Sequence, residues 1–162
     1  MDPAHGIPYV DPDPQLDSIR RTFDAATDRL YRAKTMQEAE DELSNVLHQL
    51  YRLGELCRWR LSQPPGTKLG ENEFHKILTS SDELRIARAA MWARTFNTHD
   101  VLMLATTYDP FGRWMPFLYG TAFASPTEPD KYGRDADYAK FLEGQLVVDA
   151  TRRAFAALAA LL

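Results

Sequence analysis

The sequence has few of the features that mark secreted, metal-binding or membrane proteins. A single cysteine, Cys57, excludes a disulfide framework and a cysteine-rich zinc site. Apolar runs such as Val101–Ala105 and Ala154–Leu162 are far shorter than the roughly 20 residues that a membrane-spanning helix needs. The N-terminal segment lacks the basic and apolar regions of a signal peptide. We therefore expect a cytoplasmic protein with no membrane partner.

Neither sign of charge dominates the chain, and the common catalytic motifs are missing. The 19 Lys and Arg against 23 Asp and Glu leave a net charge of −4, so any site for a polyanion must be local. The sequence has no Walker loop, glycine-rich dinucleotide turn, His-Glu-x-x-His motif, di-iron Glu-x-x-His pair or nucleophile elbow. We therefore predict neither a metal ion nor another cofactor.

Prolines divide the 162 residues into segments, because a proline inside a helix costs about 3 kcal/mol. A proline-rich segment opens the chain, so we predict an extended arm over residues 1–14 and a single domain over residues 15–162. A second break falls between the predicted helices, and a third cluster lies in an aromatic-rich segment. The three clusters are Pro3, Pro8, Pro12 and Pro14; Pro64 and Pro65; and Pro110, Pro116, Pro126 and Pro129.

The first half of the chain predicts two long helices in an antiparallel hairpin. Asp13 followed by Pro14 is typical of a helix start, and the apolar spacing continues to about Lys34. Thr35 and Glu38 form a capping box that begins a second helix, which should end before Pro64. The apolar stripe of this second helix consists of Ala39, Leu43, Val46, Leu50, Leu53 and Cys57.

The second half predicts the remaining helices and one irregular connection. We expect a short helix over Glu71–Leu78, a central helix from the capping box at residues 80–83, and a closing helix of about seven turns from Arg134. The central helix either breaks near residues 97–100 or continues through Val101–Thr107, and we favour helix there. Tyr108–Lys131, rich in proline and aromatics, predicts an irregular crossover. The fold class is thus all-α: a single bundle of four to five helices.

Histidine spacing gives the main indication of chemistry. We interpret His48 and His75 as boundary residues of their helices, whereas His99 follows Arg94 by five positions. An imidazole can move protons at a ribose 2′-hydroxyl and a leaving 5′-oxygen, and a guanidinium can hold the phosphate without a metal. On one ideal helix these two side chains would lie roughly 140° apart. A helix end, a break or a second subunit would bring them together.

At Arg94 and His99 the chain resembles the HEPN superfamily, whose members are small helical bundles with an Arg-x4-6-His motif. The resemblance implies metal-independent endoribonuclease activity, with His99 as general acid and base and Arg94 as phosphate clamp. It also implies a homodimer with a composite site, and for a small protein a toxin or defence role with an inhibitory protein partner. The family commonly has Asn, Asp or His after the arginine. This chain has Thr95 there, and a polar Asn97 two positions later.

Other interpretations remain open for the same residues. Arg94 could pair with Asp100 or Asp109 while His99 ends the helix and favours its dipole. The domain would then be a catalytically silent protein-interaction module, or a HEPN-like domain that binds nucleotides without cleaving them. A basic and aromatic patch at the end of the second helix is a candidate for RNA binding by charge and stacking, although cations also simply favour a helix C-terminus. The patch comprises Arg52, Arg58, Trp59 and Arg60, beside Tyr51.

Overall fold

The computed structural model describes residues 13–62, 66–98, 104–105, 122–123 and 130–162. Six helices and one pair of two-residue strands make up this part of the chain. The helices are α1 (Pro14–Arg32), α2 (Met36–Arg60), α3 (Glu71–Leu78), α4 (Asp82–Thr98), α5 (Arg134–Phe141) and α6 (Val147–Ala159). The predicted all-α class is confirmed, with six helices where we predicted four or five.

The first two helices begin where the capping residues predict. The Asp13 carboxylate accepts hydrogen bonds from the backbone N–H groups of Gln15 at 3.1 Å and Leu16 at 3.2 Å. At the start of α2, the Thr35 hydroxyl accepts from Glu38 N–H at 3.2 Å, and the Glu38 carboxylate accepts from Lys34 N–H at 2.7 Å. These side chains satisfy donors that each helix start leaves unpaired, which fixes both boundaries.

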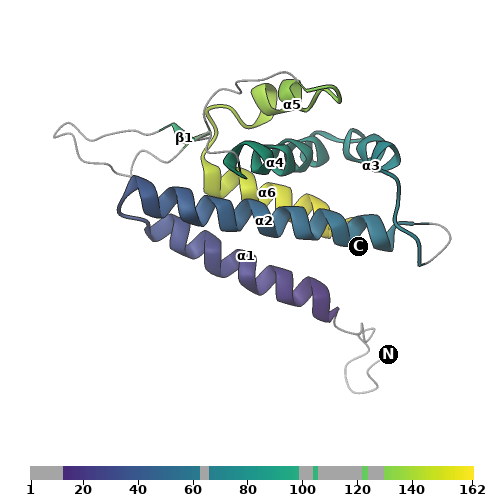
Figure 1. Ribbon diagram of the computed structural model, residues 1–162, viewed down its shortest axis with the longest axis horizontal. Helices are drawn as coiled ribbons and strands as arrows, with labels where there is room; N and C mark the ends of the chain where they lie inside the picture. The colour runs from purple at the N-terminus through teal and green to yellow at the C-terminus, as the bar shows by residue number, and fades with distance from the viewer. Residues whose placement is uncertain (1–12, 63–65, 99–103, 106–121, 124–129) are drawn as a thin grey trace, which may run out of the picture.

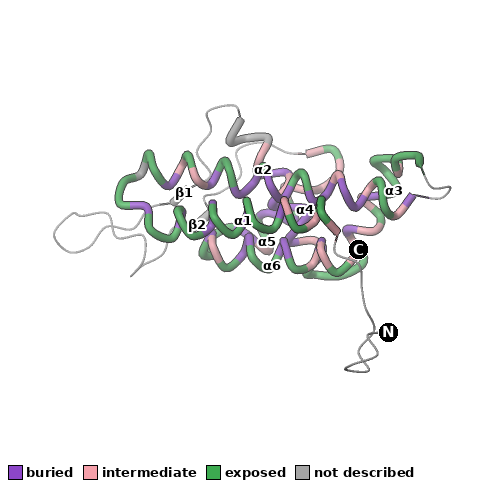
Figure 2. The backbone as a smooth tube through the Cα atoms, turned by 90° about the horizontal axis from the view of Figure 1, so that it is seen from below, coloured by how far each residue is buried: buried purple, intermediate pink, exposed green. Residues whose placement is uncertain are grey.

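The core lies between α1, α2, α4 and α6. Figure 1 shows α1 at one edge and α5 at the other, with α2, α4 and α6 between them. Buried residues follow the inward sides of the helices in Figure 2, and the predicted apolar stripe of α2 is fully buried along its length. Phe23 of α1 meets Phe155 of α6 with ring centroids 4.4 Å apart, which ties the two ends of the chain together.

The predicted closing helix is wrong, because the chain breaks into α5 and α6. Gly144 adopts a left-handed backbone conformation with φ of +76°. The N–H groups of Leu142 and Glu143 both bond to the Tyr138 carbonyl at 2.9 Å, which closes the last turn of α5. Because glycine enters the left-handed region without a steric penalty, it ends helices readily, and the heptad spacing masked this signal.

The helix predicted over Val101–Thr107 is also wrong where the structure describes it. Leu104–Ala105 forms strand β1, which pairs antiparallel with β2, Ala122–Phe123. Leu104 lies opposite Phe123 in this register. A short apolar run suits a strand as well as a helix, and its partner across the crossover decides between them. The predicted arm before residue 13 and most of the crossover lie outside the described residues.

None of the helices in the described ranges is both long and apolar enough to cross a bilayer.

Candidate functional site

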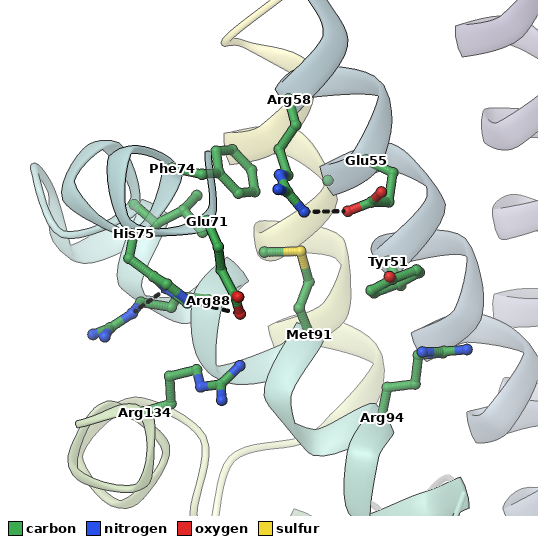
Figure 3. Close-up of a pocket in the computed structure, with 12 residues that line it drawn as sticks. Tyr51, Glu55, Arg58, Glu71, Phe74, His75, Arg88, Met91, Arg94 and Arg134 are labelled. Atoms are coloured by element: carbon green, nitrogen blue, oxygen red, sulfur yellow. Dashed lines mark hydrogen bonds and ion pairs between the residues drawn. The ribbon is translucent and has the colours of Figure 1, made fainter. Parts of the chain in front are cut away.

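Arg94 lies on α4 with its side chain against α2. Its guanidinium carbon lies 4.2 Å from the centre of the Tyr51 ring, within the range of a cation–π interaction (Figure 3). Helix α4 ends at Thr98. His99 and the side chain of Asn97 lie outside the described residues, so the structure places the predicted phosphate clamp and leaves its predicted catalytic partner unplaced.

Arg94 is one of four arginines that line a pocket between α2, α3 and α4, to which α5 contributes Arg134. We call this the arginine pocket (Figure 3). Its cavity volume is about 110 Å³, which is room for a phosphate group, and the cavity is partly open to solvent. The residues that line it are Tyr51, Gly54, Glu55, Arg58, Glu71, Phe74, His75, Leu78, Arg88, Met91, Arg94 and Arg134.

Arg88 forms the buried base of this pocket. Its Nη1 donates to Asp137 Oδ2 at 2.7 Å, and its Nη2 donates to the Tyr132 carbonyl. The side chains of Arg88 and Asp137 are 7% and 8% exposed. A buried charge pair of this kind is stabilised only while both partners are present, so Arg88 holds a fixed position.

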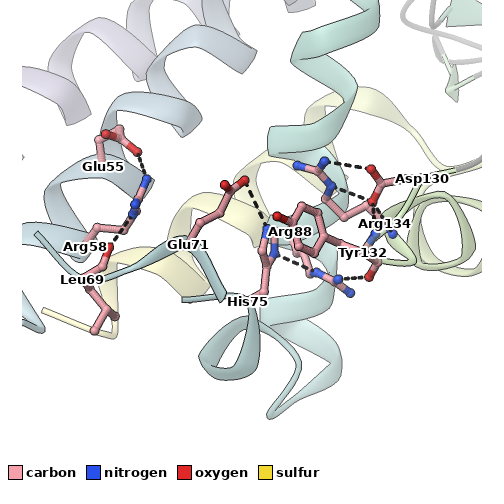
Figure 4. Close-up of polar contacts among 9 residues, drawn as sticks. All are labelled: Glu55, Arg58, Leu69, Glu71, His75, Arg88, Asp130, Tyr132 and Arg134. Atoms are coloured by element: carbon pink, nitrogen blue, oxygen red, sulfur yellow. Dashed lines mark hydrogen bonds and ion pairs between the residues drawn. The ribbon is translucent and has the colours of Figure 1, made fainter. Parts of the chain in front are cut away.

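His75 connects α3 to this buried pair (Figure 4). Arg88 Nε donates to His75 Nδ1 at 3.2 Å, and the imidazole stacks on Tyr132 with ring centroids 4.5 Å apart. Burial, then the charges of Arg88 and Arg134, lower the pKa of His75 below 6.5. Because Nδ1 accepts a hydrogen bond, the neutral ring carries its proton on Nε2, which lies 3.7 Å from the Glu71 carboxylate.

The two remaining arginines of the pocket are held by carboxylates. Arg134 Nε and Nη2 each donate to Asp130 at 2.8 Å, and this pairing lowers the Asp130 pKa to about 2. Arg58 Nη1 donates to Glu55 at 3.0 Å, and its Nε donates to the Leu69 carbonyl at 3.0 Å. Each guanidinium is therefore oriented before any ligand arrives.

The predicted basic and aromatic patch is divided between two surfaces of α2. Arg58 lines the arginine pocket, whereas Arg52, Trp59 and Arg60 line a groove of about 660 Å³ between α1 and α2. We call this second site the aromatic groove, because Tyr51 and Trp59 both line it. The Trp59 side chain is 49% exposed. Tyr51 lines both sites and connects them.

Other ionisable residues of α2 have less distinctive roles. His48 lines the aromatic groove, and its pKa is lowered by burial and then by the charges of Arg94 and Arg52. Burial raises the pKa of the Cys57 thiol to about 12, and its Sγ donates to the Leu158 carbonyl at 3.4 Å. Cys57 is therefore the buried thiol that its place in the apolar stripe predicts, and it is a poor nucleophile.

Sequence reasoning missed the group formed by Glu71, His75, Arg88 and Arg134. We interpreted His75 as a boundary residue, whereas it lies inside an arginine cluster. Two signals were available: Glu71 and His75 are four residues apart on one helix, and Arg88 interrupts the buried face of α4. Neither signal shows that α5 delivers Arg134 to the same place.

Comparisons with protein-family models, with curated proteins and with solved structures find no match to this chain. Within the described ranges, no group of three or more His, Cys, Asp and Glu side chains is arranged to hold a metal ion. The case for a function therefore depends on the chemistry of the arginine pocket and the residues around it.

Proposed function

We propose that this protein is a HEPN-like endoribonuclease that needs no metal ion. The observation that carries the proposal is the convergence of four arginines on one pocket, with Arg94 among them. Arginine is the side chain best suited to hold phosphate, because its planar group donates two parallel hydrogen bonds. A local cluster of this kind supplies the polyanion site that the net charge of −4 does not.

In the proposed reaction His99 moves the protons and Arg94 holds the scissile phosphate. A ribose 2′-oxygen attacks the phosphorus as its proton is removed, and the bond to the 5′-oxygen breaks as that oxygen is protonated. The products are a 2′,3′-cyclic phosphate and a 5′-hydroxyl, so the step consumes neither water nor an oxidant. In the proposed geometry the segment after Arg94 turns His99 toward the same phosphate, because five residues of one ideal helix would leave the two side chains roughly 140° apart.

The wider proposal concerns assembly and cellular role. We place α1 and α2 as the hairpin and α4 as the central helix of a HEPN-like bundle. Two copies form a homodimer in which the Arg94 and His99 pairs of both subunits make one composite site. The protein acts in the cytoplasm as a toxin or defence nuclease and is held inactive by a protein partner.

The aromatic groove extends the proposed RNA path beyond the pocket. Bases of a single strand stack on Trp59, and Arg52 and Arg60 follow the backbone, since stacking on aromatic rings tolerates any base. Tyr51 joins the groove to the pocket, so one strand can contact both. Asn97 completes the proposed substrate contacts near the end of α4.

The test is cleavage of mixed cellular RNA in EDTA by purified protein. His99→Ala should lower the rate by about 10²- to 10⁴-fold, the usual contribution of a general acid or base, and Arg94→Ala should lower it similarly. Arg32→Ala is the matched control for Arg94→Ala, because Arg32 is an exposed arginine of α1 paired with Asp28. His5→Ala, in the N-terminal segment that the sequence predicts as an arm, is the control for His99→Ala. Unchanged cleavage by His99→Ala would contradict the assigned role.

A second candidate, a HEPN-like domain that binds nucleotides without cleaving them, is favoured by one observation. Arg94 packs on Tyr51, which places an aromatic ring beside a phosphate-binding group. This candidate predicts no cleavage in EDTA. It also predicts that nucleotides raise the melting temperature, and that Arg94→Ala weakens this shift more than His99→Ala does.

A further inference from the structure

Glu71 places a carboxylate inside the arginine pocket. Figure 3 shows its side chain reaching from the start of α3 toward the middle of the lining residues, between Arg134 and Arg58. Within the described ranges the Glu71 carboxylate faces His75, with 3.7 Å between Nε2 of the neutral ring and the carboxylate oxygen. The Glu71 side chain is 58% exposed, so it can leave the pocket without disturbing the core.

The other carboxylates around the pocket are committed to the framework. Asp137 and Asp130 hold Arg88 and Arg134, and the Glu55 carboxylate binds both Arg58 and Lys68. Glu71 is the exception among these four acids, because its contact is longer and its side chain is the most exposed. An incoming anion would therefore displace Glu71 rather than any of the acids that orient the arginines.

We propose that the arginine pocket binds a terminal phosphate, at an RNA end or on a nucleotide, which takes the place of the Glu71 carboxylate. The inference rests on the proposed function for its RNA ligand. In the occupied pocket His75 Nε2–H donates to a phosphate oxygen, and Arg58 and Arg134 neutralise its charge. The Glu71 carboxylate moves outward when phosphate binds. Because it competes with phosphate for the same place, it sets the affinity of the pocket for phosphate.

Size and charge favour a terminal phosphate over an internal phosphodiester. A cavity of about 110 Å³ accepts one phosphate group, whereas an internal phosphodiester would bring a sugar on each side. A phosphate monoester carries a charge of about −1.5 to −2 at pH 7, roughly twice that of a phosphodiester. The surplus charge suits a site that offers several oriented guanidinium groups and loses one carboxylate when it fills.

Two positions along α4 give the terminal phosphate and the scissile phosphate different places, because Arg88 lies near the middle of the helix and Arg94 nearer its C-terminal end. Arg88 and Arg94 are six residues apart, which is about 9 Å along the helix axis. The terminal phosphate lies near Arg88, beside His75 and Arg134. The neighbouring phosphodiester then reaches Arg94, next to Tyr51. The pocket would thereby position an RNA end relative to the proposed cleavage site.

The test uses fluorescence anisotropy with a labelled five-nucleotide RNA that carries a 5′-phosphate, a 3′-phosphate or only hydroxyl ends. Competition with adenosine monophosphate and with inorganic phosphate distinguishes an RNA end from a free nucleotide as the source of the phosphate. The variants are Glu71→Gln and His75→Gln, with Glu73→Gln as the matched control. Glu73 lies on the same helix, pairs with Lys76 and is not part of the pocket.

We expect a phosphorylated end to bind at least 10-fold more tightly than hydroxyl ends. Glu71→Gln should tighten binding of the phosphorylated RNA by about 3- to 10-fold, since it removes the competing charge, and Glu73→Gln should leave it unchanged. His75→Gln should reduce the difference in affinity between phosphorylated and hydroxyl RNA, while its melting temperature stays the same as that of the wild type. Tighter binding of the phosphorylated RNA than of adenosine monophosphate supports an RNA end, and equal binding supports a free nucleotide.

Two results would overturn this inference, and they differ in what they leave standing. The first is equal affinity for phosphorylated and hydroxyl RNA, together with equal affinity of Glu71→Gln and Glu73→Gln for the phosphorylated RNA. This result would overturn the terminal-phosphate site and leave RNA binding itself in place. No binding of RNA, nucleotide or phosphate by any of the proteins would overturn both the inference and the proposed function.

Discussion

The two sides of α2 carry similar residues in different physical states. In the arginine pocket, Arg88 and its carboxylate partner are buried and the other guanidiniums are oriented by ion pairs or an aromatic ring. In the aromatic groove, Trp59 is half exposed and Arg60 is held by Asp13 and Gln15 near the protein surface. A fixed set of donors can select one chemical group, whereas exposed rings and cations add affinity without much selection.

The largest expected effect is that of removing the base of the pocket. Arg88→Ala leaves the buried Asp137 with only its longer contact to Arg85, at 3.7 Å, and it removes the donor to His75. We expect a loss of about 3–5 kcal/mol in the free energy of unfolding, measured by urea denaturation. The double variant Arg88→Ala, Asp137→Ala should lose less than the sum of the two single changes. If the stability loss of the double variant equalled the sum of the two single losses, Arg88 and Asp137 would not act as a pair.

The next largest effect is expected from a substitution that narrows the arginine pocket without disturbing the fold. A methyl group on Gly54 would lie too close to the sulfur of Met91, a flexible side chain that lines the pocket. Gly54→Ala should therefore shift Met91 and lower the affinity for phosphorylated RNA by about 10-fold, with stability within about 1 kcal/mol because alanine favours the helix. Adding Met91→Ala should restore binding. A failure of this rescue would show that Met91 does not control the space.

A smaller effect is expected from pH. The folded protein keeps the pKa of His75 below its ordinary 6.5, because of burial and of Arg88 and Arg134. As pH falls below about 6.5 the unfolded chain takes up a proton first, so this contribution lowers stability until folded His75 is also protonated. Urea midpoints from pH 8 to pH 5 should fall less for His75→Gln than for wild type. Burial also lowers the pKa of His48, which is present in both proteins, so the difference between them isolates His75.

The smallest effects are expected in the aromatic groove. The Arg60–Asp13 pair has Arg60 48% exposed, and such pairs contribute about 0.2–1 kcal/mol. Arg60→Ala should change stability by no more than this in thermal denaturation. Trp59→Ala should leave stability unchanged and weaken RNA with phosphorylated and hydroxyl ends equally. If Trp59→Ala weakened the binding of phosphorylated RNA alone, the aromatic groove and the arginine pocket would not differ in what they recognise.

The sequence predicted most of the helical architecture because its signals are local. The Asp13 cap, the Thr35–Glu38 box and the apolar stripe of α2 act within a few turns, and each is present in the structure. The breaks were harder to predict. Gly144 ends α5 inside an apparently continuous heptad pattern, and Leu104–Ala105 becomes a strand because of partners 19 and 17 residues further along the chain. Only the tertiary fold shows such a partner.

The candidate site was predictable in part for the same reason. Arg94 was identified from its spacing to His99, and it lies on the pocket. His75, Arg88 and Arg134 come from three different helices, so no window of sequence contains them. Arg58 and Trp59 are adjacent in sequence yet line different sites, because consecutive helix positions point about 100° apart. A patch defined along the sequence therefore mixed two surfaces.

The most direct test of the central claim is an NMR titration of the arginine Nε–Hε signals with a five-nucleotide RNA that carries a 5′-phosphate. Arg→Lys variants at each position assign the signals. We expect the signals of Arg58, Arg88, Arg94 and Arg134 to shift together at low RNA concentration, and those of Arg52 and Arg60 to follow weakly. Shifts confined to Arg52 and Arg60, with the four pocket signals unchanged, would contradict the central claim.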